Sequence, residues 1–357
     1  MRIAQVAPLT ESCPPHTYGG TERLVSVLTE GLVRQGHQVT LFASGDSQTS
    51  AILRPACERA LRLDPQCRDP LAHHMVMFHQ VWRSAEQFEI IHFHTDYFHF
   101  PLFAPLANKT LTTLHGRLDL PDLPAVLREF AMMPLVSISH AQRTPVSWAN
   151  WCGTVFHGLP VECLLPGRGA GGYLAFLGRI SPEKGPERAI EIARRAGMPL
   201  VIAAKVDKVD REYHRTCIEP LLDDPLIEFV GEVDDREKAA LLGDATALLF
   251  PIDWPEPFGL VMIEAMAAGT PVVAFRRGSV PEIIEDGVTG FIVESVDDAV
   301  AASLAAQKLD RGLIRRRFEA RFSAERMTRD YLALYDEVLR HSAGAPKPAA
   351  AATAADG

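Results

Sequence analysis

The chain has few cysteines, no long apolar run and no excess of positive charge. Its 357 residues include six cysteines, none of them in a C-x-x-C pair. Without a run of about 18 apolar residues, no membrane-spanning helix is expected. Without an apolar stretch that leads into a small-residue cleavage site, no signal peptide is expected. The thiols are therefore predicted to be reduced, in a cytoplasmic protein.

The charge balance excludes one broad class of partner. Lys and Arg number 36 against 45 Asp and Glu, which gives a net charge of −9. A protein that binds the phosphate backbone of nucleic acid would carry an excess of basic residues, so no nucleic acid partner is predicted. The hydrophobic share of 47% and the charged share of 23% are those of an ordinary globular protein. At about 150 residues per domain, the length predicts two domains.

Strand and helix signals alternate from the start of the chain. The apolar run Arg2–Ala7 predicts a strand, Thr21–Gln35 predicts a helix that ends at Gly36, and Gln38–Ala43 predicts the next strand. Further strands are predicted at Glu89–His94, Thr110–His115, Leu135–Ser139 and Thr154–Phe156. This alternation is typical of a parallel sheet covered by helices.

The alternation starts again after a glycine-rich segment, PGRGAGG, at 166–172. Its composition predicts a flexible hinge linker between an N-terminal domain, 1–165, and a C-terminal domain, 173–322. Two such units enclose a cleft, and open α/β sheets bind ligands beyond the carboxyl ends of their strands. The second domain is predicted to hold strands at Tyr173–Leu177, Leu200–Ala204, Ile227–Val230, Ala245–Phe250 and Pro271–Phe275, with helices at Glu187–Arg195 and Asp235–Leu242.

The end of the chain has a different pattern. Within the segment 323–341, residues 324–340 predict a helix with one apolar stripe, which must pack on another surface. The last residues, 342–357, have too few apolar side chains to form a core, which predicts a disordered tail.

The densest signal is the segment Glu256–Ala274, EPFGLVMIEAMAAGTPVVA. A helix that begins at Gly259 directs unpaired N–H groups and the positive end of its dipole at the edge of the sheet, which suits a pyrophosphate. Glu256 can accept hydrogen bonds from sugar hydroxyls, and Glu264 can bind a second diol such as a ribose. The alternative is that both glutamates are solvated surface charges. The apolar run around Glu264 argues against that alternative, because a buried charge needs a partner.

The pattern EPFGLxxxEAMAxGxPVV resembles the signature of the family 4 (GT4) retaining glycosyltransferases, and the likeness covers nearly the whole chain. It implies the α/β GT-B fold of two facing Rossmann-like domains, with the acceptor side in 1–165, the donor side in 173–322 and a last helix that crosses back. It implies transfer of a hexosyl group from a UDP- or GDP-sugar to a hydroxyl of a sugar, a lipid-linked sugar or a small molecule. It further implies that the α configuration is kept, that no cofactor or divalent metal is needed, and that the enzyme acts in cell-surface polysaccharide, glycolipid or small-glycoside synthesis.

The family's phosphate contacts fall on matching residues. Gly19 and Gly20, within Tyr18–Glu22, resemble the glycine loop that lies against the donor phosphates, where a Cβ would block close approach. The alternative is a plain strand-to-helix turn. Arg179 and Lys184, within GRISPEKG, resemble the two cations that stabilise the leaving diphosphate. The alternative is a pair of surface charges.

Other matching positions concern the sugar, the base and the acceptor. His115 resembles the strand-end histidine beside the transferred sugar, the alternative being a satisfied structural histidine. Val230 begins a segment that resembles the loop whose backbone holds the nucleobase, and Asp96 lies where relatives bind the acceptor. The predicted catalytic residues are His115, Arg179, Lys184 and Glu256. The predicted substrate-binding residues are Gly19, Gly20, Asp96, Val230, Phe258, Gly259, Leu260 and Glu264.

Two further signals receive a structural interpretation. His92, His94 and His99 look like a metal cluster, but no cysteine or carboxylate set completes a usual spacing, so no metal site is predicted. The segment from Ser279 to Glu282 matches a capping box, so Glu282 is predicted to cap that helix.

Four other functions compete with this prediction. A sugar-nucleotide epimerase or a phosphorylase would share the implied fold. A nicotinamide-dependent oxidoreductase would need G-x-G-x-x-G after the first strand and an acid about 20 residues further on, at the end of the second strand. Neither feature is found at these places. A binding protein without activity is disfavoured by the full set of predicted charged residues. The sequence selects no sugar, base, acceptor or oligomeric state, and it leaves open peripheral contact with the inner face of a membrane.

Overall fold

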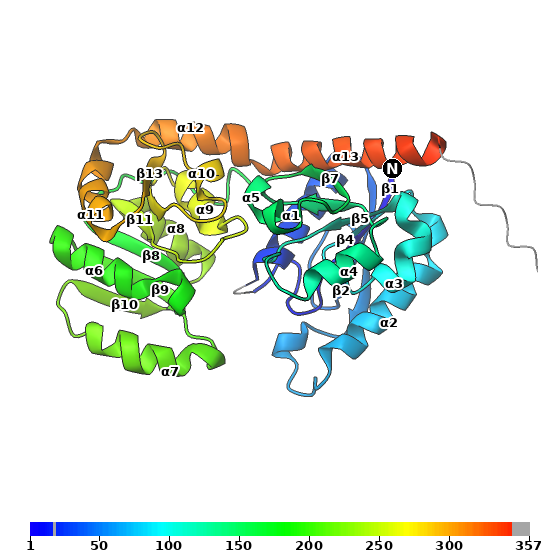
Figure 1. Cartoon of the computed structure of the whole chain (residues 1–357), viewed down its shortest axis with the longest axis horizontal. Helices are drawn as coiled ribbons and strands as arrows, with labels where there is room; N and C mark the ends of the chain where they lie inside the picture. The colour runs from blue at the N-terminus through cyan, green and yellow to red at the C-terminus, as the bar shows by residue number, and fades with distance from the viewer. Residues whose placement is uncertain (17–18, 345–357) are drawn as a thin grey trace, which may run out of the picture.

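The computed structural model describes residues 1–16 and 19–344. These residues form two α/β domains that lie side by side, each with a parallel sheet between helices (Figure 1). Tyr18 and residues 345–357 lie outside the described residues. Of the predicted tail only 342–344 is described, and these residues continue the last helix.

The N-terminal domain is built on a seven-stranded sheet in the order β3-β2-β1-β4-β5-β6-β7, with every pair parallel. Its central strands are buried on both faces, as expected for a parallel sheet covered by helices. The strands are β1 Arg2–Val6, β2 Gln38–Ser44, β3 Ile52–Cys57, β4 Ile90–Phe93, β5 Thr110–Thr113, β6 Leu135–Ser137 and β7 Trp151–Thr154. The helices are α1 Gly20–Arg34, α2 Pro70–Arg83, α3 Phe100–Phe103, α4 Leu123–Glu129 and α5 His140–Arg143.

The C-terminal domain has a six-stranded parallel sheet in the order β10-β9-β8-β11-β12-β13. The strands are β8 Leu174–Arg179, β9 Leu200–Lys205, β10 Ile227–Gly231, β11 Ala247–Phe250, β12 Val272–Phe275 and β13 Gly290–Val293. The helices of this domain are α6 Pro186–Ala196, α7 Arg211–Tyr213, α8 Asp235–Asp244, α9 Leu260–Ala267, α10 Val280–Ile283, α11 Val296–Ala305 and α12 Arg311–Phe322, and α13 Ala324–Gly344 ends the described chain.

The predicted alternation of strands and helices is confirmed, but the sequence does not predict β3 and β13, which form two of the sheet edges. β3 is largely exposed and contains Pro55, which a sheet tolerates at its edge. β13 has four residues and begins at a glycine. β7 begins three residues before the predicted strand Thr154–Phe156 and overlaps it only at Thr154. Edge strands lack the continuous apolar run that marks a central strand.

The chain crosses between the domains at two points that lie side by side. Leu159 N donates to Phe322 O (2.9 Å) and Ala324 N donates to Leu159 O (2.8 Å), so the first crossing pairs with the break between α12 and α13. Glycine is required at 158 because a Cβ on Gly158 would lie 2.3 Å from the oxygen of Ser323. The two crossings therefore form one joint.

The glycine-rich segment 166–172 is not this joint. Gly167 N, Gly169 N and Gly171 N donate to carbonyl oxygens of the C-terminal domain at 3.0, 3.0 and 2.9 Å. A Cβ on Gly167 would lie 2.1 Å from Gly243 O, and the Arg311 side chain donates to Gly167 O (3.2 Å). The small residues thus permit close packing. The segment predicted as a hinge linker is fixed to the C-terminal domain, and the crossing lies before it.

The last helix, α13, runs along the N-terminal domain and packs against α1 (Figure 1). Its apolar stripe is buried there, with Tyr331 2% and Tyr335 0% exposed. Among residues 1–16 and 19–344, no helix is both long and apolar enough to cross a membrane.

The predicted capping box is wrong, because the Glu282 carboxylate caps a helix of the other domain. Glu282 accepts hydrogen bonds from His140 N (2.8 Å) and Ala141 N (2.7 Å), at the start of α5. The Ser279 hydroxyl donates instead to Phe258 O (2.9 Å). Ser279 has a helical backbone (φ −75°, ψ −6°) rather than the extended one that an N-cap residue needs. Glu282 therefore joins the two domains.

Candidate active site

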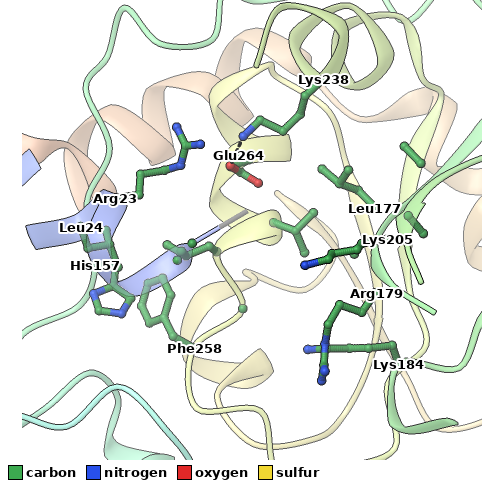
Figure 2. A pocket seen from close by; sticks show the side chains of 18 of the residues that line it. Arg23, Leu24, His157, Leu177, Arg179, Lys184, Lys205, Lys238, Phe258 and Glu264 are labelled. Carbon is green, nitrogen blue, oxygen red and sulfur yellow. Dashed lines mark hydrogen bonds and ion pairs between the residues drawn. The ribbon is translucent and has the colours of Figure 1, made fainter. Parts of the chain in front are cut away.

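A cavity of about 690 Å³ lies between the two domains. On one side it is lined by the start of α1 and by two histidines that follow β5 and β7. On the other side it is lined by the ends of β8, β9 and β11, the loop after β10 and the start of α9. These are the carboxyl ends of parallel strands, where open α/β sheets bind ligands. Figure 2 shows the cavity from close by.

The helix N-terminus predicted from the motif lies at this cavity. Gly259 precedes α9 with φ +80°, and a Cβ there would lie 2.7 Å from Met262 Cε. Phe258, Gly259 and Leu260 all line the cavity. None of the described side chains caps the first turn of α9. The helix therefore offers backbone N–H donors and the positive end of its dipole to an anion.

Gly19 and Gly20 also line the cavity, at the start of α1. Gly19 occupies the N-cap position of that helix. A Cβ on Gly19 would lie 2.9 Å from Pro15 Cβ and 3.1 Å from Glu11 Cγ. A larger residue would therefore be crowded, and the two glycines bring the backbone to the cavity wall.

Glu264 is buried and paired, so the alternative of a solvated surface charge is wrong for this residue. Its side chain is 11% exposed, and Lys238 Nζ lies 2.6 Å from its Oε1. Lys238 also contacts Asp235 (3.0 Å), which in turn accepts from Arg23 of the other domain (2.8 Å). Burial lowers the pKa of Lys238, but the carboxylates of Glu264 and Asp235 together outweigh this effect and raise it. The cavity thus holds a charged network at this end.

A second group of cations lies at the opposite end. Figure 2 shows Arg179, Lys184 and Lys205 extending into the same part of the cavity. Lys184 Nζ donates to Glu256 Oε2 (2.5 Å) and lies 4.7 Å from the centre of the Trp254 ring. The Glu256 side chain is 10% exposed. Three positive side chains converge here, which suits an anion with more than one negative charge.

Each of the other two cations also has a nearby carboxylate. Arg179 contacts Glu183 (2.9 Å) and Asp207 (3.5 Å), and Lys205 contacts Asp207 (3.1 Å). The Arg179 side chain is 29% exposed. These acids hold the cations in place while their charged groups stay accessible to a ligand.

His115 lines the cavity, and its ring is held by other histidines. A hydrogen bond links His115 Nε2 to His94 Nδ1 (2.9 Å), and the His157 ring is stacked at 5.4 Å. Burial lowers the pKa of His115 to about 3, so the ring is neutral at ordinary pH. The structure therefore places His115 as a neutral hydrogen-bonding group.

The remaining histidines are bound to protein groups. His92 is linked to Tyr335 (2.7 Å) and Thr113 (2.8 Å), and His99 to Thr112 (3.0 Å). In the described part of the chain, no group of three or more His, Cys, Asp or Glu is arranged to hold a metal ion.

Two predicted residues lie outside the cavity wall. Asp96 follows β4 as an exposed residue with φ +49°. Val230 is 42% exposed, and the wall beyond β10 is formed by the four residues 232–235 instead.

Among the described cavity residues that were not predicted from the sequence, four carry a basic side chain: Arg23, His157, Lys205 and Lys238. Lys205 ends β9 at the carboxyl edge of the sheet, and this position is the signal that could have found it. Lys238 lies within a polar stretch of α8 that resembles a solvated surface, so no local pattern marks it. Arg23 and His157 enter the site only through the approach of the two domains.

Comparison with known proteins shows which family the chain resembles. The family model for glycosyl transferases group 1 matches residues 169–322, and the model for Glycosyltransferase Family 4 matches residues 18–150. A phosphatidyl-myo-inositol mannosyltransferase of Mycobacterium leprae is 27% identical, over 95% of this chain and 96% of that protein. A D-inositol 3-phosphate glycosyltransferase of Mycolicibacterium smegmatis is 30% identical, over 65% of this chain and 57% of that protein.

Solved structures share the fold. AviGT4, a glycosyltransferase involved in avilamycin A biosynthesis, has a TM-score of 0.69 and 22% identity, over 97% of this chain and 99% of that chain. A sucrose-phosphate synthase from Thermosynechococcus elongatus has a TM-score of 0.75 and 18% identity, over 96% of this chain and 100% of that chain. The two family models match the chain one after the other, and each match falls on one of the two domains. The chain therefore belongs to the family 4 glycosyltransferases and is a glycosyltransferase of the GT-B fold.

Proposed function

We propose that this enzyme transfers a hexosyl group from a UDP- or GDP-sugar to a hydroxyl acceptor and keeps the α configuration. The observation that carries the proposal is the convergence of the α9 N-terminus with Arg179, Lys184 and Lys205 in one cavity. Both features favour a diphosphate. A solved structure of the same fold, HepE of Anabaena, contains UDP and glucose.

The positions around the cations suggest how the donor lies. The diphosphate is proposed to bind between Arg179, Lys184 and the first turn of α9. Glu264, towards the other end of the cavity, is proposed to accept hydrogen bonds from the ribose, with the base against residues 232–235. The hexose then lies towards His115, on the side of the N-terminal domain.

The proposed reaction needs no protein nucleophile. The bond between the sugar C1 and the diphosphate oxygen breaks, and the acceptor oxygen bonds to C1 on the same face. The proton of the acceptor hydroxyl passes to the leaving phosphate. Negative charge grows on the diphosphate as it leaves, and the fixed cations and helix dipole stabilise that charge. Closure of the two domains over the donor would exclude water, which would otherwise hydrolyse it.

Thermal unfolding with UDP, GDP and ADP tests the donor site. A nucleotide that binds the folded state raises the melting temperature by mass action. At a nucleotide concentration 100 times its Kd, the free energy of unfolding increases by about 2.7 kcal/mol. Lys184→Ala should reduce this increase. Lys308→Ala, which removes a cation that does not line the cavity, should not. If none of the three nucleotides raises the melting temperature of the unmodified chain, the proposed donor site is wrong.

Product analysis tests the reaction itself. Incubation with UDP-glucose or GDP-mannose and candidate acceptors should yield an α-linked product by NMR. Activity should survive EDTA, because side chains and the helix terminus supply the positive charge. A β-linked product would contradict retention, and loss of activity with EDTA that returns on adding Mg²⁺ would contradict independence from metal.

For the acceptor and the cellular location we propose classes rather than a single molecule or site. We expect the hydroxyl of a sugar, a lipid-linked sugar or a small molecule, used in the cytoplasm or at the inner face of the membrane. The relative from Mycobacterium leprae, named for mannosyl transfer to phosphatidyl-myo-inositol, supports testing lipid-linked acceptors first.

A further inference from the structure

Hydrogen bonds connect the last helix to His115 through the interior of the N-terminal domain. They join Tyr335 to Gln5, Gln5 to His94, and His94 to His115, each at 2.9 Å. Gln5, His94 and Tyr335 are at most 4% exposed. We call these four residues the histidine relay. The proposed reaction uses only its last member.

The Gln5 amide sets the direction of the histidine relay. Its oxygen faces His94 Nε2, and an amide oxygen can only accept, so His94 carries its proton on Nε2. Burial lowers the pKa of His94 well below its ordinary value, so the ring is neutral and its Nδ1 carries no proton. This Nδ1 therefore accepts a hydrogen bond from Nε2–H of His115.

The same reasoning applies to His115. A neutral ring with its proton on Nε2 has a bare Nδ1, which can only accept. Among the described residues, this buried atom has no hydrogen-bond partner, although His115 lines the cavity. Buried polar atoms are normally paired. A hydroxyl group of a ligand would supply the missing donor.

We propose that Gln5 and His94 are positioning residues that hold His115 as a hydrogen-bond acceptor for a hydroxyl of the transferred sugar. This inference rests on the proposed function, which places the sugar on this side of the cavity. His115 then orients the sugar and does not give a proton to the leaving phosphate. A Gln5 amide turned by 180° would reverse every bond of the histidine relay and make Nδ1 a donor.

The far end of the histidine relay can satisfy the amide orientation found here. Tyr335 Oη accepts from Gln5 Nε2 and can donate its own proton to His92 Nδ1 (2.7 Å). His92 Nε2–H can then donate to Thr113 (2.8 Å). Each of these groups thus keeps both a donor and an acceptor role. His99 lies on a separate branch, bonded to Thr112, and provides a buried control.

The test reads the tautomer directly. Long-range ¹H–¹⁵N correlation spectra of the whole chain, with the His115 signals identified by their loss in His115→Gln, should show the proton on Nε2. Gln5→Met removes the amide oxygen at similar volume and should give a mixture of tautomers. Gln5→Glu keeps an acceptor towards His94 and should restore the tautomer. His99→Gln should leave it unchanged.

Kinetics complete the test. Release of UDP from UDP-glucose, or of GDP from GDP-mannose, should have a kcat about tenfold lower in Gln5→Met, with recovery in Gln5→Glu, because one orienting hydrogen bond is lost. The affinity for UDP or GDP alone should stay within about twofold, since the nucleotide lacks the sugar. Circular dichroism checks that each variant is folded.

The outcomes separate this inference from the proposed function. A proton on Nδ1 of His115 in the unmodified chain, or a Gln5→Met variant with unchanged tautomer and kcat, would overturn the inference. Failure of UDP, GDP and ADP to bind would overturn the proposed donor site, while the tautomer would still be readable. If Gln5→Met does not fold, His94→Gln is read in the same way, with a mixture of tautomers expected.

Discussion

Two lysines reach buried glutamates from opposite ends of the cavity. Lys184 contacts Glu256 at 2.5 Å and Lys238 contacts Glu264 at 2.6 Å. In both pairs each side chain is at most 17% exposed. A lysine in such a pair has two effects, since it balances a buried carboxylate in the free protein and presents positive charge to a ligand. Substitution of a lysine alone therefore mixes stability with function.

A double variant separates these two effects at Lys184. Lys184→Gln should lower kcat by about 100-fold, because charge on the leaving diphosphate is no longer offset. It should also lower the free energy of unfolding by roughly 2–4 kcal/mol, because the Glu256 carboxylate is left buried and unpaired. Adding Glu256→Gln should restore most of the stability and none of the turnover. Urea unfolding and steady-state kinetics measure both, and recovery of turnover in the double variant would contradict a role of Lys184 in catalysis.

Sequence reasoning finds residues whose local pattern carries their chemistry. Glu264 stands out because an acid interrupts an apolar helix, and Gly259 because a strand-to-helix turn needs a positive φ. Lys238 does not stand out, because its partner lies 26 positions further along the chain and its own helix is polar. A site residue defined by a distant partner needs the folded structure.

At the scale of elements, central strands are predictable and edges and contacts between helices are not. β1 and β4 are mostly apolar and buried, whereas none of the residues of β3 is buried. The packing of α1 on α13 depends on one small residue, because a Cβ on Gly31 would lie 2.3 Å from the Thr328 Oγ1. Thr328 is fully buried there. Nothing in the α1 sequence indicates this contact.

The contact between α1 and α13 predicts coupled substitutions. Gly31→Ala should lower the free energy of unfolding by about 1–3 kcal/mol through overpacking, although alanine by itself favours a helix. Thr328→Ala removes the oxygen that the new methyl group contacts. It should therefore lower the free energy of unfolding less in the Gly31→Ala variant than in the unmodified chain. Urea unfolding of the four proteins measures this. Strictly additive losses would show that the two helices do not pack as described.

Among the residues whose burial the structure describes, five histidines of the N-terminal domain have rings that burial keeps neutral. Burial lowers the pKa of each, to about 3 for His115 and well below the ordinary value for the others, which are His92, His94, His99 and His157. In the unfolded chain these rings take up protons below a pKa of about 6.5. The unfolded state therefore binds more protons below that pH, and stability must fall as the pH falls.

This linkage predicts a steep loss of stability between pH 6.5 and pH 5. Each buried histidine contributes up to about 1.4 kcal/mol per pH unit. His99→Gln should therefore reduce the slope of the free energy of unfolding against pH by up to about 1.4 kcal/mol per pH unit. Urea unfolding at pH 7.5, 6.5 and 5.5 gives the slopes. A free energy of unfolding that is constant over this range would mean that these rings are not held neutral.

The domains are joined by Glu282 as well as by the chain itself. Glu282→Ala leaves the first N–H groups of α5 without their partner, so it should weaken the contact between the domains by roughly 1 kcal/mol, a small value because the site is partly exposed. Small-angle scattering of the free protein should show a larger radius of gyration. Glu294→Ala, which removes a carboxylate paired only within the C-terminal domain, serves as control. Equal radii in both variants would contradict this role.

The paired crossings at Leu159 and Ser323 make the second domain an insertion into the first. The described chain both starts and finishes on the N-terminal domain, where α13 covers α1 and supplies Tyr335 to the interior. On the ribosome, domains usually fold in order of synthesis. Here the N-terminal domain is made first, but α13, which covers it, is made last. The N-terminal domain therefore stays partly uncovered until residues beyond 324 have left the exit tunnel. The first domain is therefore completed only after the second domain has been synthesised.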